Sequence, residues 1–133
     1  MTGAGPRHVE SFRMALEAGV PVMLGSDLPP FWGIDGTNAT AWEYGLMADN
    51  GLGARGALAA ATTVPAGWLG VADRLGTVAV GKEADLLVVD GDPLTDASVV
   101  RTVSMVLQGG RVVPGSESGA PRSARQAVPA AGG

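Results

Sequence analysis

A short apolar run lies between glycines near the start of the chain, as Gly19-Val20-Pro21-Val22-Met23-Leu24-Gly25, and leads directly into Ser26-Asp27. An apolar run without alternation suits a strand buried on both faces of a parallel sheet, although periodicity alone leaves a buried helix segment open. The flanking glycines, the β-branched valines and the shortness of the run favour a strand over residues 21–24. Such a strand places the Asp27 carboxylate at its carboxyl end, the edge where parallel α/β folds bind ligands. On the local pattern alone, a turn or helix-capping aspartate is the commoner role.

Helices are predicted on both sides of this run. Residues Pro6 to Ala18 place apolar side chains on one face at helical spacing, and Gly19 follows as a helix stop. Two prolines and two glycines predict a loop over residues 28–36. Its Phe31 and Trp32 either wall a pocket or pin the loop onto a neighbouring helix. Further helices are expected from residue 37 or 38 to about Ala48, from Ala54 to Thr63, and from Pro65 to Leu69.

The second half of the chain changes to strand-type patterning. Strands are predicted at Leu86–Val89, at Val99–Leu107 and, after a Gln-Gly-Gly turn, at Arg111–Val113. Three short strands with exposed edges are marginal alone, so we expect them to need partners from elsewhere. From Pro114 the residues are mostly Gly, Ser, Ala, Pro and Arg, which cannot bury enough apolar surface to offset the entropy of ordering. A disordered tail is therefore predicted over residues 114–133.

Length and charge exclude several classes of protein. The chain has 133 residues, long enough for a real core but too short for a complete (β/α)8 barrel of about 250 residues. Thirteen acidic against nine basic residues argue against a nucleic-acid partner, and the absence of cysteine excludes disulfides and thiolate metal sites. No basic stretch followed by an apolar run marks a secretory signal, and no apolar segment approaches the ~20 residues that cross a bilayer. We expect a cytoplasmic protein without a membrane partner.

Three apparent motifs have simpler explanations. Gly76 to Lys82 has the spacing of a phosphate-binding loop, but Glu83 stands where Ser or Thr is required and a strand follows instead of a helix. Asp90, Asp92 and Asp96 lack the glutamate that closes a calcium loop, so a proline-containing turn explains them better. His8 is the only histidine, and a lone histidine near a helix start is most often solvated or capping.

Three stretches, in order, resemble the carboxyl-terminal part of the amidohydrolase superfamily. They are Ala18 to Asp27, similar to the last barrel strand of that family; Ala57 to Thr62 with Pro65-Ala66 and Leu69-Gly70, similar to the following helices; and Arg74 to Asp90, similar to the re-entry into a small β-sandwich. Asp92-Pro93-Leu94 and Val106 to Val113 extend the resemblance, which is closest to the imidazolonepropionase-like and prolidase-like branch.

The resemblance implies an α/β architecture: the last strand and trailing helices of a (β/α)8 barrel over residues 1–70, then β-sandwich strands over 71–113. It also implies a hydrolase that cleaves C–N bonds of small-molecule amides, often cyclic ones, with a divalent metal, zinc. Asp27 matches the family aspartate that contacts the metal, takes a proton from the metal-bound water and passes it to the leaving nitrogen. Phe31, Trp32 and Asn38 are the expected substrate contacts.

The histidines and the Lys or Glu that complete this metal site in the family have no counterparts here. We therefore expect an incomplete fold, a carboxyl-terminal fragment that alone neither binds metal tightly nor turns over. Its expected partner is an upstream-encoded barrel chain or a second copy of itself. The alternative is a non-catalytic remnant that binds a partner through unpaired strand edges and an exposed barrel face.

Overall fold

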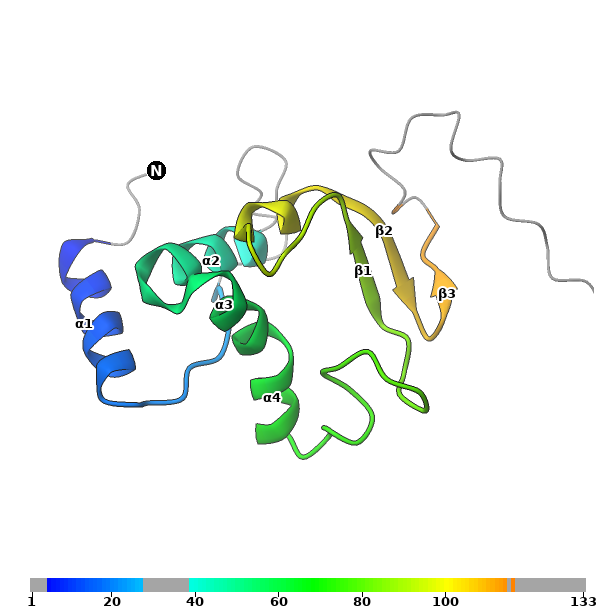
Figure 1. The fold of residues 1–133 in the computed structure, drawn as a ribbon, viewed down its shortest axis with the longest axis horizontal. Coiled ribbons are helices and arrows are strands. Elements are labelled where there is room, and N and C mark those ends of the chain that lie inside the picture. Colours follow the sequence, from blue (N-terminus) through cyan, green and yellow to red (C-terminus); the bar gives the residue numbers. More distant parts are fainter. Residues whose placement is uncertain (1–4, 28–38, 115, 117–133) are drawn as a thin grey trace, which may run out of the picture.

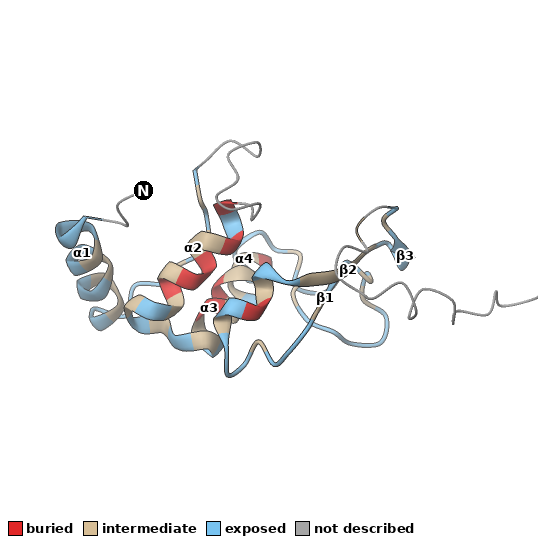
Figure 2. Ribbon diagram, turned by 90° about the horizontal axis from the view of Figure 1, so that it is seen from above, coloured by how far each residue is buried: buried red, intermediate tan, exposed pale blue. Residues whose placement is uncertain are grey.

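The computed structural model describes residues 5–27, 39–114 and 116. Helices occupy the first half of the described chain and a small antiparallel sheet occupies the second half, on the other side of the molecule (Figure 1). The sheet projects away from the helices when seen from above (Figure 2). The chain is therefore an α/β protein in which the two types of element lie side by side.

The first helix, α1 (Pro6–Glu17), agrees with the predicted range to within one residue. Pro6 occupies its first turn, where a missing N–H costs nothing. Gly19 follows with φ +72°, and its N–H donates to the Leu16 carbonyl at 3.0 Å, so the predicted glycine stop is confirmed. No residue of α1 is buried. The helix is tied to the rest of the chain by Arg13, whose guanidinium donates to the carbonyl and side-chain oxygens of Asn50 at 3.4 Å.

Three helices and a π-helical turn form the centre of the molecule: α2 (Ala39–Met47), η1 (Ala48–Leu52), α3 (Gly53–Ala61) and α4 (Thr63–Trp68). The chain turns at Gly51, whose φ of +135° suits glycine alone, which confirms that Asn50-Gly51 ends the second helix. The buried residues gather on these helices (Figure 2). They are Ala39, Ala41, Tyr44, Met47, Ala57, Ala60 and Ala66, joined by Val99 from the second half. Because most of them are alanine, the helices approach closely.

The sheet has the order β1-β2-β3, with β1 (Leu86–Val89), β2 (Val103–Gln108) and β3 (Arg111–Val112) all antiparallel to their neighbours. Leu86 pairs with Leu107 and Leu87 with Val106, and a bulge follows Val88. The β2–β3 turn is formed by Gly109 and Gly110, which both have positive φ, as a two-residue hairpin requires. The predicted hairpin is confirmed.

The predicted strand over Val99–Leu107 was wrong in its first part, because residues Ala97–Arg101 form the 3-10 helix η2. The Asp96 carboxylate accepts a hydrogen bond from the Ser98 N–H at 2.8 Å and so begins a helical turn instead of a ladder. Val99 is buried in this turn against Gly91, where an added Cβ would lie 2.7 Å from the Val99 Cγ1. The strand proper begins only at Val103.

The end of the described chain returns to the sheet. The Ser116 hydroxyl accepts from the Val106 N–H at 3.2 Å and donates to the Val113 carbonyl at 2.6 Å. The described part of the predicted tail is Pro114 and Ser116, and its other residues, 115 and 117–133, lie outside the described part of the chain, so the tail stays a prediction. Each helix among the described residues is too short or too polar to span a lipid bilayer.

Candidate functional site

The segment that leads to Asp27 is extended but is not a strand of a sheet. From Val20 to Asp27 no ladder partner occurs within the described residues, so the predicted strand over Pro21–Leu24 is not formed here. The segment is held to the helices by the Leu24 N–H, which donates to the Ala60 carbonyl of α3 at 2.9 Å. A strand ladder requires a neighbouring strand on at least one side, and the described chain places helices there instead.

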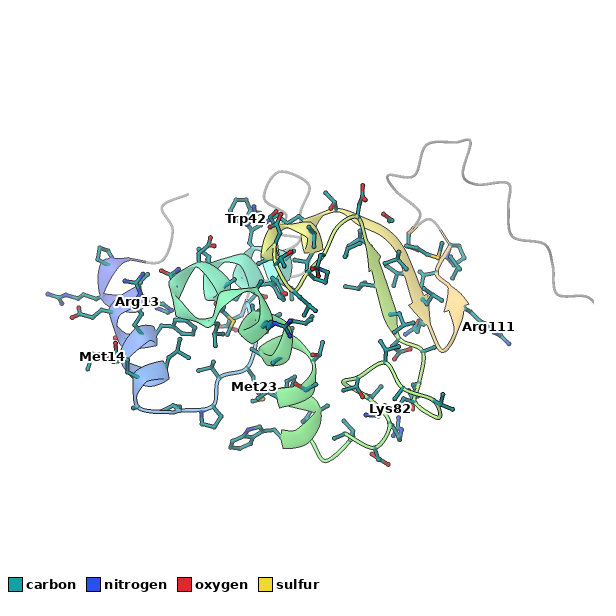
Figure 3. All side chains as sticks on the ribbon, viewed as in Figure 1. Arg13, Met14, Met23, Trp42, Lys82 and Arg111 are labelled. Atoms are coloured by element: carbon teal, nitrogen blue, oxygen red, sulfur yellow. The ribbon has the colours of Figure 1, made fainter. Side chains whose placement is uncertain are left out.

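The prediction that this run is buried on both faces was wrong. Val22, Leu24 and Ser26 are half-buried, whereas Val20 and Met23 are 50% and 46% exposed. Side chains of an extended chain alternate between two sides, so one side of the segment faces the helices and the other is open. Figure 3 labels Met23 on this segment. The open side carries Pro21, Met23, Gly25 and Asp27.

Asp27 ends this segment with φ +49°, the one positive φ among the described non-glycine residues. Aspartate tolerates this left-handed conformation better than most residues, but it still costs on the order of 1 kcal/mol. The carboxylate stands at the end of the extended segment. Strained residues of this kind gather at functional sites, which makes Asp27 a candidate by geometry as well as by sequence.

The Asp27 carboxylate is exposed and makes no hydrogen bond or ion pair within the described part of the chain. A carboxylate at the end of a buried strand was expected, whereas the observed carboxylate is exposed at the end of an extended segment that belongs to no sheet in the described residues. Pro21, Met23 and Gly25, which lie on the same side of the segment as Asp27, are exposed too, so the outer side of residues 21–27 is uncovered.

The other candidate residues add no further group to the site around Asp27 in the described part of the chain. Phe31, Trp32 and Asn38 lie outside the described residues, so their expected role in substrate contact stays a prediction. Glu43 is half-buried on α2, and His8 is exposed on α1.

No three side chains of the types His, Cys, Asp and Glu come close enough in residues 5–27, 39–114 and 116 to hold a metal ion. A zinc ion in a protein is held by three or four such ligands. Asp27 offers a carboxylate of the right type, so it fits as one ligand of a larger set but not as a site by itself.

The rejected phosphate loop proves to be a structural turn. The Lys82 ammonium donates to the backbone carbonyls of Ala72 at 2.6 Å and Leu75 at 3.3 Å, so it is occupied within its own loop (Figure 3). Arg74 and Glu83 form an ion pair beside it, with Nε to Oε1 at 2.7 Å. A lysine that closes a loop onto carbonyls is not a phosphate ligand.

The suspected calcium loop is likewise a pair of turns, as predicted. The Asp92 carboxylate accepts the Leu94 N–H at 2.9 Å, and that of Asp96 accepts the Ser98 N–H. Hydrogen bonds from the Ser98 side chain and from this N–H lower the pKa of Asp96 below its ordinary value.

Sequence reasoning missed the contact that joins the helices to the β-rich half. The Arg101 guanidinium, at the end of η2, lies over the Trp42 ring of α2 with 4.1 Å between Cζ and the ring centroid (Figure 3). Gly45, one turn further along α2, leaves the space for it, because an added Cβ would lie 2.8 Å from the Arg101 Nη2. A glycine inside a predicted helix, three residues after a tryptophan, was the available signal in the sequence.

A profile of the amidohydrolase family matches residues 3–114, which is most of the chain. The chain belongs to the amidohydrolase family. The matched range includes Asp27, all the helices and all three strands described above. The comparison with curated proteins finds no match.

Solved structures agree with this assignment. This amidohydrolase chain is 35% identical to a Xaa-Pro dipeptidase solved with bound methionine (TM-score 0.71), a match that covers 84% of this chain and 26% of that one. It is 37% identical to a prolidase solved with N-methylphosphonate-L-proline (TM-score 0.66; 81% and 26% covered) and 28% identical to a molinate hydrolase (TM-score 0.66; 84% and 27% covered). The chain thus spans about a quarter of the length of the solved structures it matches.

Proposed function

We propose that this chain is the carboxyl-terminal part of a metal-dependent amidohydrolase that cleaves C–N bonds of small amides. The observation that carries the proposal is the family match over residues 3–114 together with the quarter of the solved relatives that the chain spans. The exposed apolar side chains of Val20 and Met23 on the segment that leads to Asp27 support it, because exposed apolar surface marks a site of contact with other parts of a protein. The (β/α)8 barrel and β-sandwich remain part of this proposal, as does the division at residue 70.

In this proposal Asp27 supplies one carboxylate ligand, and the other ligands come from the remainder of a longer protein. A bound divalent metal, zinc in our proposal, would lower the pKa of a coordinated water toward ~7. The Asp27 carboxylate is suited to accept a proton there and to donate it to the leaving nitrogen. Its backbone is left-handed, with φ +49°, at the end of the segment.

The substrate class follows from two relatives. One was solved as a Xaa-Pro dipeptidase and one as a prolidase with a phosphonate-proline compound, so dipeptides with carboxyl-terminal proline are the first substrates to assay. The molinate hydrolase shows that a similar fold also occurs in an enzyme named for a different substrate, so the assay must include non-peptide and cyclic amides.

The decisive experiment replaces Asp27 by Asn in the longer protein that carries this chain. Loss of the proton acceptor is expected to lower kcat by roughly 10²–10⁴-fold while the unfolding midpoint stays unchanged. The matched control is Asp73→Asn, an exposed aspartate in the loop after α4, which is expected to leave kcat as it is. Near wild-type turnover in the Asp27→Asn enzyme contradicts the assignment.

A non-catalytic binding module is the second candidate, and the unpaired edge of the sheet favours it. The reading frame upstream of this chain distinguishes the two, because only an enzyme requires a His-x-His segment there. Calorimetric titration of the 133-residue chain with zinc gives an independent check. We expect no site of micromolar affinity or better, and one such site would show that the chain needs no outside ligands.

A further inference from the structure

The turn that ends the second helix contains the one Asn-Gly pair of the sequence, Asn50-Gly51. Both residues depart from helical geometry, with φ −103° and ψ 19° at Asn50 and φ +135° at Gly51. A main-chain nitrogen attacks the preceding asparagine side chain with least hindrance when it belongs to glycine, because glycine has no Cβ beside that nitrogen. Gly51 is exposed, so water reaches the pair. The turn therefore meets the steric and solvent requirements of such a reaction.

The Arg13 guanidinium contacts both groups that would react. Its Nη2 donates to the Asn50 side-chain Oδ1 and its Nε to the Asn50 main-chain carbonyl oxygen, each at 3.4 Å (Figure 3). A cation on Oδ1 draws electrons from the Asn50 Cγ and stabilises the negative oxygen that forms when a nucleophile adds there. A cation on the main-chain carbonyl makes the Gly51 N–H more acidic, because it favours the deprotonated amide. One side chain therefore activates the electrophile and the nucleophile together.

One hydrogen bond opposes the reaction. The Asn50 Nδ2 donates to the Leu46 carbonyl at 2.7 Å and holds the side-chain amide against α2. Breaking a hydrogen bond of this kind slows a reaction roughly fivefold. The two contacts of Arg13 are long and exposed, and they favour the reaction by a similar factor. The opposing contacts of Asn50 come close to cancelling, so we expect the folded turn to react at a rate near that of an unfolded chain.

We propose that Asn50 is a site of spontaneous deamidation that Arg13 promotes. The Gly51 nitrogen attacks the Asn50 Cγ, the new C–N bond closes a five-membered succinimide ring, and the Cγ–Nδ2 bond breaks. Ammonia leaves with the proton that the Gly51 nitrogen gave up. Water then opens the ring at either of its carbonyls, which gives aspartate or isoaspartate at position 50. The reaction needs only water, and the proposal does not depend on the chain being part of a hydrolase.

The two products differ in their effect on the docking of α1. An aspartate carboxylate at position 50 replaces a neutral acceptor by a charged one opposite Arg13, so it strengthens the contact between α1 and η1. Isoaspartate lengthens the main chain by a methylene group beside Gly51, where even an added Cβ would lie 3.1 Å from the Leu16 Cδ1. The isoaspartate form is therefore expected to loosen α1 from η1.

The test incubates the folded 133-residue chain at mildly alkaline pH and follows residue 50 by peptide mass spectrometry, with fragmentation that separates aspartate from isoaspartate. The reference is the unfolded peptide Tyr44 to Ala57, which holds the same Asn-Gly pair without Arg13. The folded chain is expected to deamidate at Asn50 at a rate within about tenfold of the peptide. A slower rate than that overturns the proposal, because it would show that the fold protects Asn50.

Two arginine variants test the role of Arg13. Arg13→Gln is expected to slow deamidation of the folded chain roughly three- to tenfold. The matched control is Arg7→Gln, which removes the same charge from another exposed position of α1 and is expected to leave the rate unchanged. An Arg13→Gln rate that equals or exceeds that of the unmodified chain, or equal slowing in both variants, overturns the proposal.

Amide hydrogen exchange of the separated products tests the effect on α1. Exchange in Pro6–Glu17 is expected to be at least about threefold faster in the isoaspartate form than in the aspartate form. Equal exchange in the two forms would contradict the expected loosening of α1.

Discussion

At the scale of single residues, two glycines with positive φ separate the steric cost of an added side chain from its backbone cost. Gly76 has φ +89°, and an added Cβ would lie 2.7 Å from the Ala66 Cβ; Gly81 has φ +88° and nothing within 4 Å of that position. Gly76→Ala is therefore expected to destabilise the chain by about 2–4 kcal/mol, and Gly81→Ala by about 1 kcal/mol. Urea unfolding measures the free energy of unfolding of both variants. The backbone cost is common to the two and cancels in the difference between them. Equal losses would mean that Gly76 does not pack against α4.

Asp96 gives a residue-scale prediction in pH. Hydrogen bonds from the Ser98 side chain and from the Ser98 N–H lower the pKa of Asp96 below the ordinary value of 3.8. A carboxyl group with a lowered folded-state pKa stabilises the fold above its unfolded value and loses that contribution as pH falls through the folded one. Below about pH 4, the free energy of unfolding is therefore expected to fall less steeply with decreasing pH in Asp96→Asn than in the unmodified chain. The Asn side chain keeps a hydrogen-bond acceptor but cannot titrate. Parallel curves for the two proteins would contradict this.

At the scale of elements, the packing of η2 on α2 depends on Arg101 and the space above Gly45. Arg101→Ala is expected to cost about 0.5–1 kcal/mol through loss of the contact with the Trp42 ring. Gly45→Ala gains about 1 kcal/mol of helix propensity but displaces the guanidinium, so its net effect is near zero.

Their combination turns the second change from nearly neutral into stabilising. In the Arg101→Ala background the new methyl group meets nothing, so Gly45→Ala is expected to stabilise the chain by about 1 kcal/mol in a double-mutant cycle. Gly67→Ala in α4, which also has nothing within 4 Å, is the control and should give the same gain in both backgrounds. A gain at Gly45 that does not depend on Arg101 would show that the two residues do not interact.

At the scale of the whole molecule, many large apolar side chains are uncovered, among them Trp68 at 69% and Leu69 at 75% exposed at the end of α4. Trp68→Gln is therefore expected to change the stability of the 133-residue chain by no more than about 0.5 kcal/mol. In the longer protein of our proposal the same change should cost about 2 kcal/mol or more, because the side chain would then be covered.

Val99→Ala provides the comparison. Val99 is already buried, so its replacement should lower the free energy of unfolding by about 2 kcal/mol in both proteins. A Trp68→Gln cost that is equally small in both would show that α4 stays uncovered, and would weaken the proposal of a longer enzyme.

The sequence by itself determined the elements whose cause is local. The proline and glycine that bound α1, the two glycines of the β2–β3 turn and the four apolar residues of β1 all act within a few residues, so their ranges were predictable. The family resemblance was readable as well, because it is carried by ordered stretches such as Arg74 to Asp90, and the profile match over residues 3–114 confirms it.

Only the tertiary structure decided which surfaces are covered. The run Pro21–Leu24 has the composition of a buried strand, yet it is open on one side, because a ladder needs a neighbouring strand that residues of this segment cannot supply. Residues 99–101 have strand propensity, but the Asp96 cap and the space beside Gly91 hold them in a helical turn. The contact of Arg101 with Trp42 joins residues 59 positions apart, and no local pattern encodes it. Composition states that a segment can be buried, whereas burial itself depends on what folds against it.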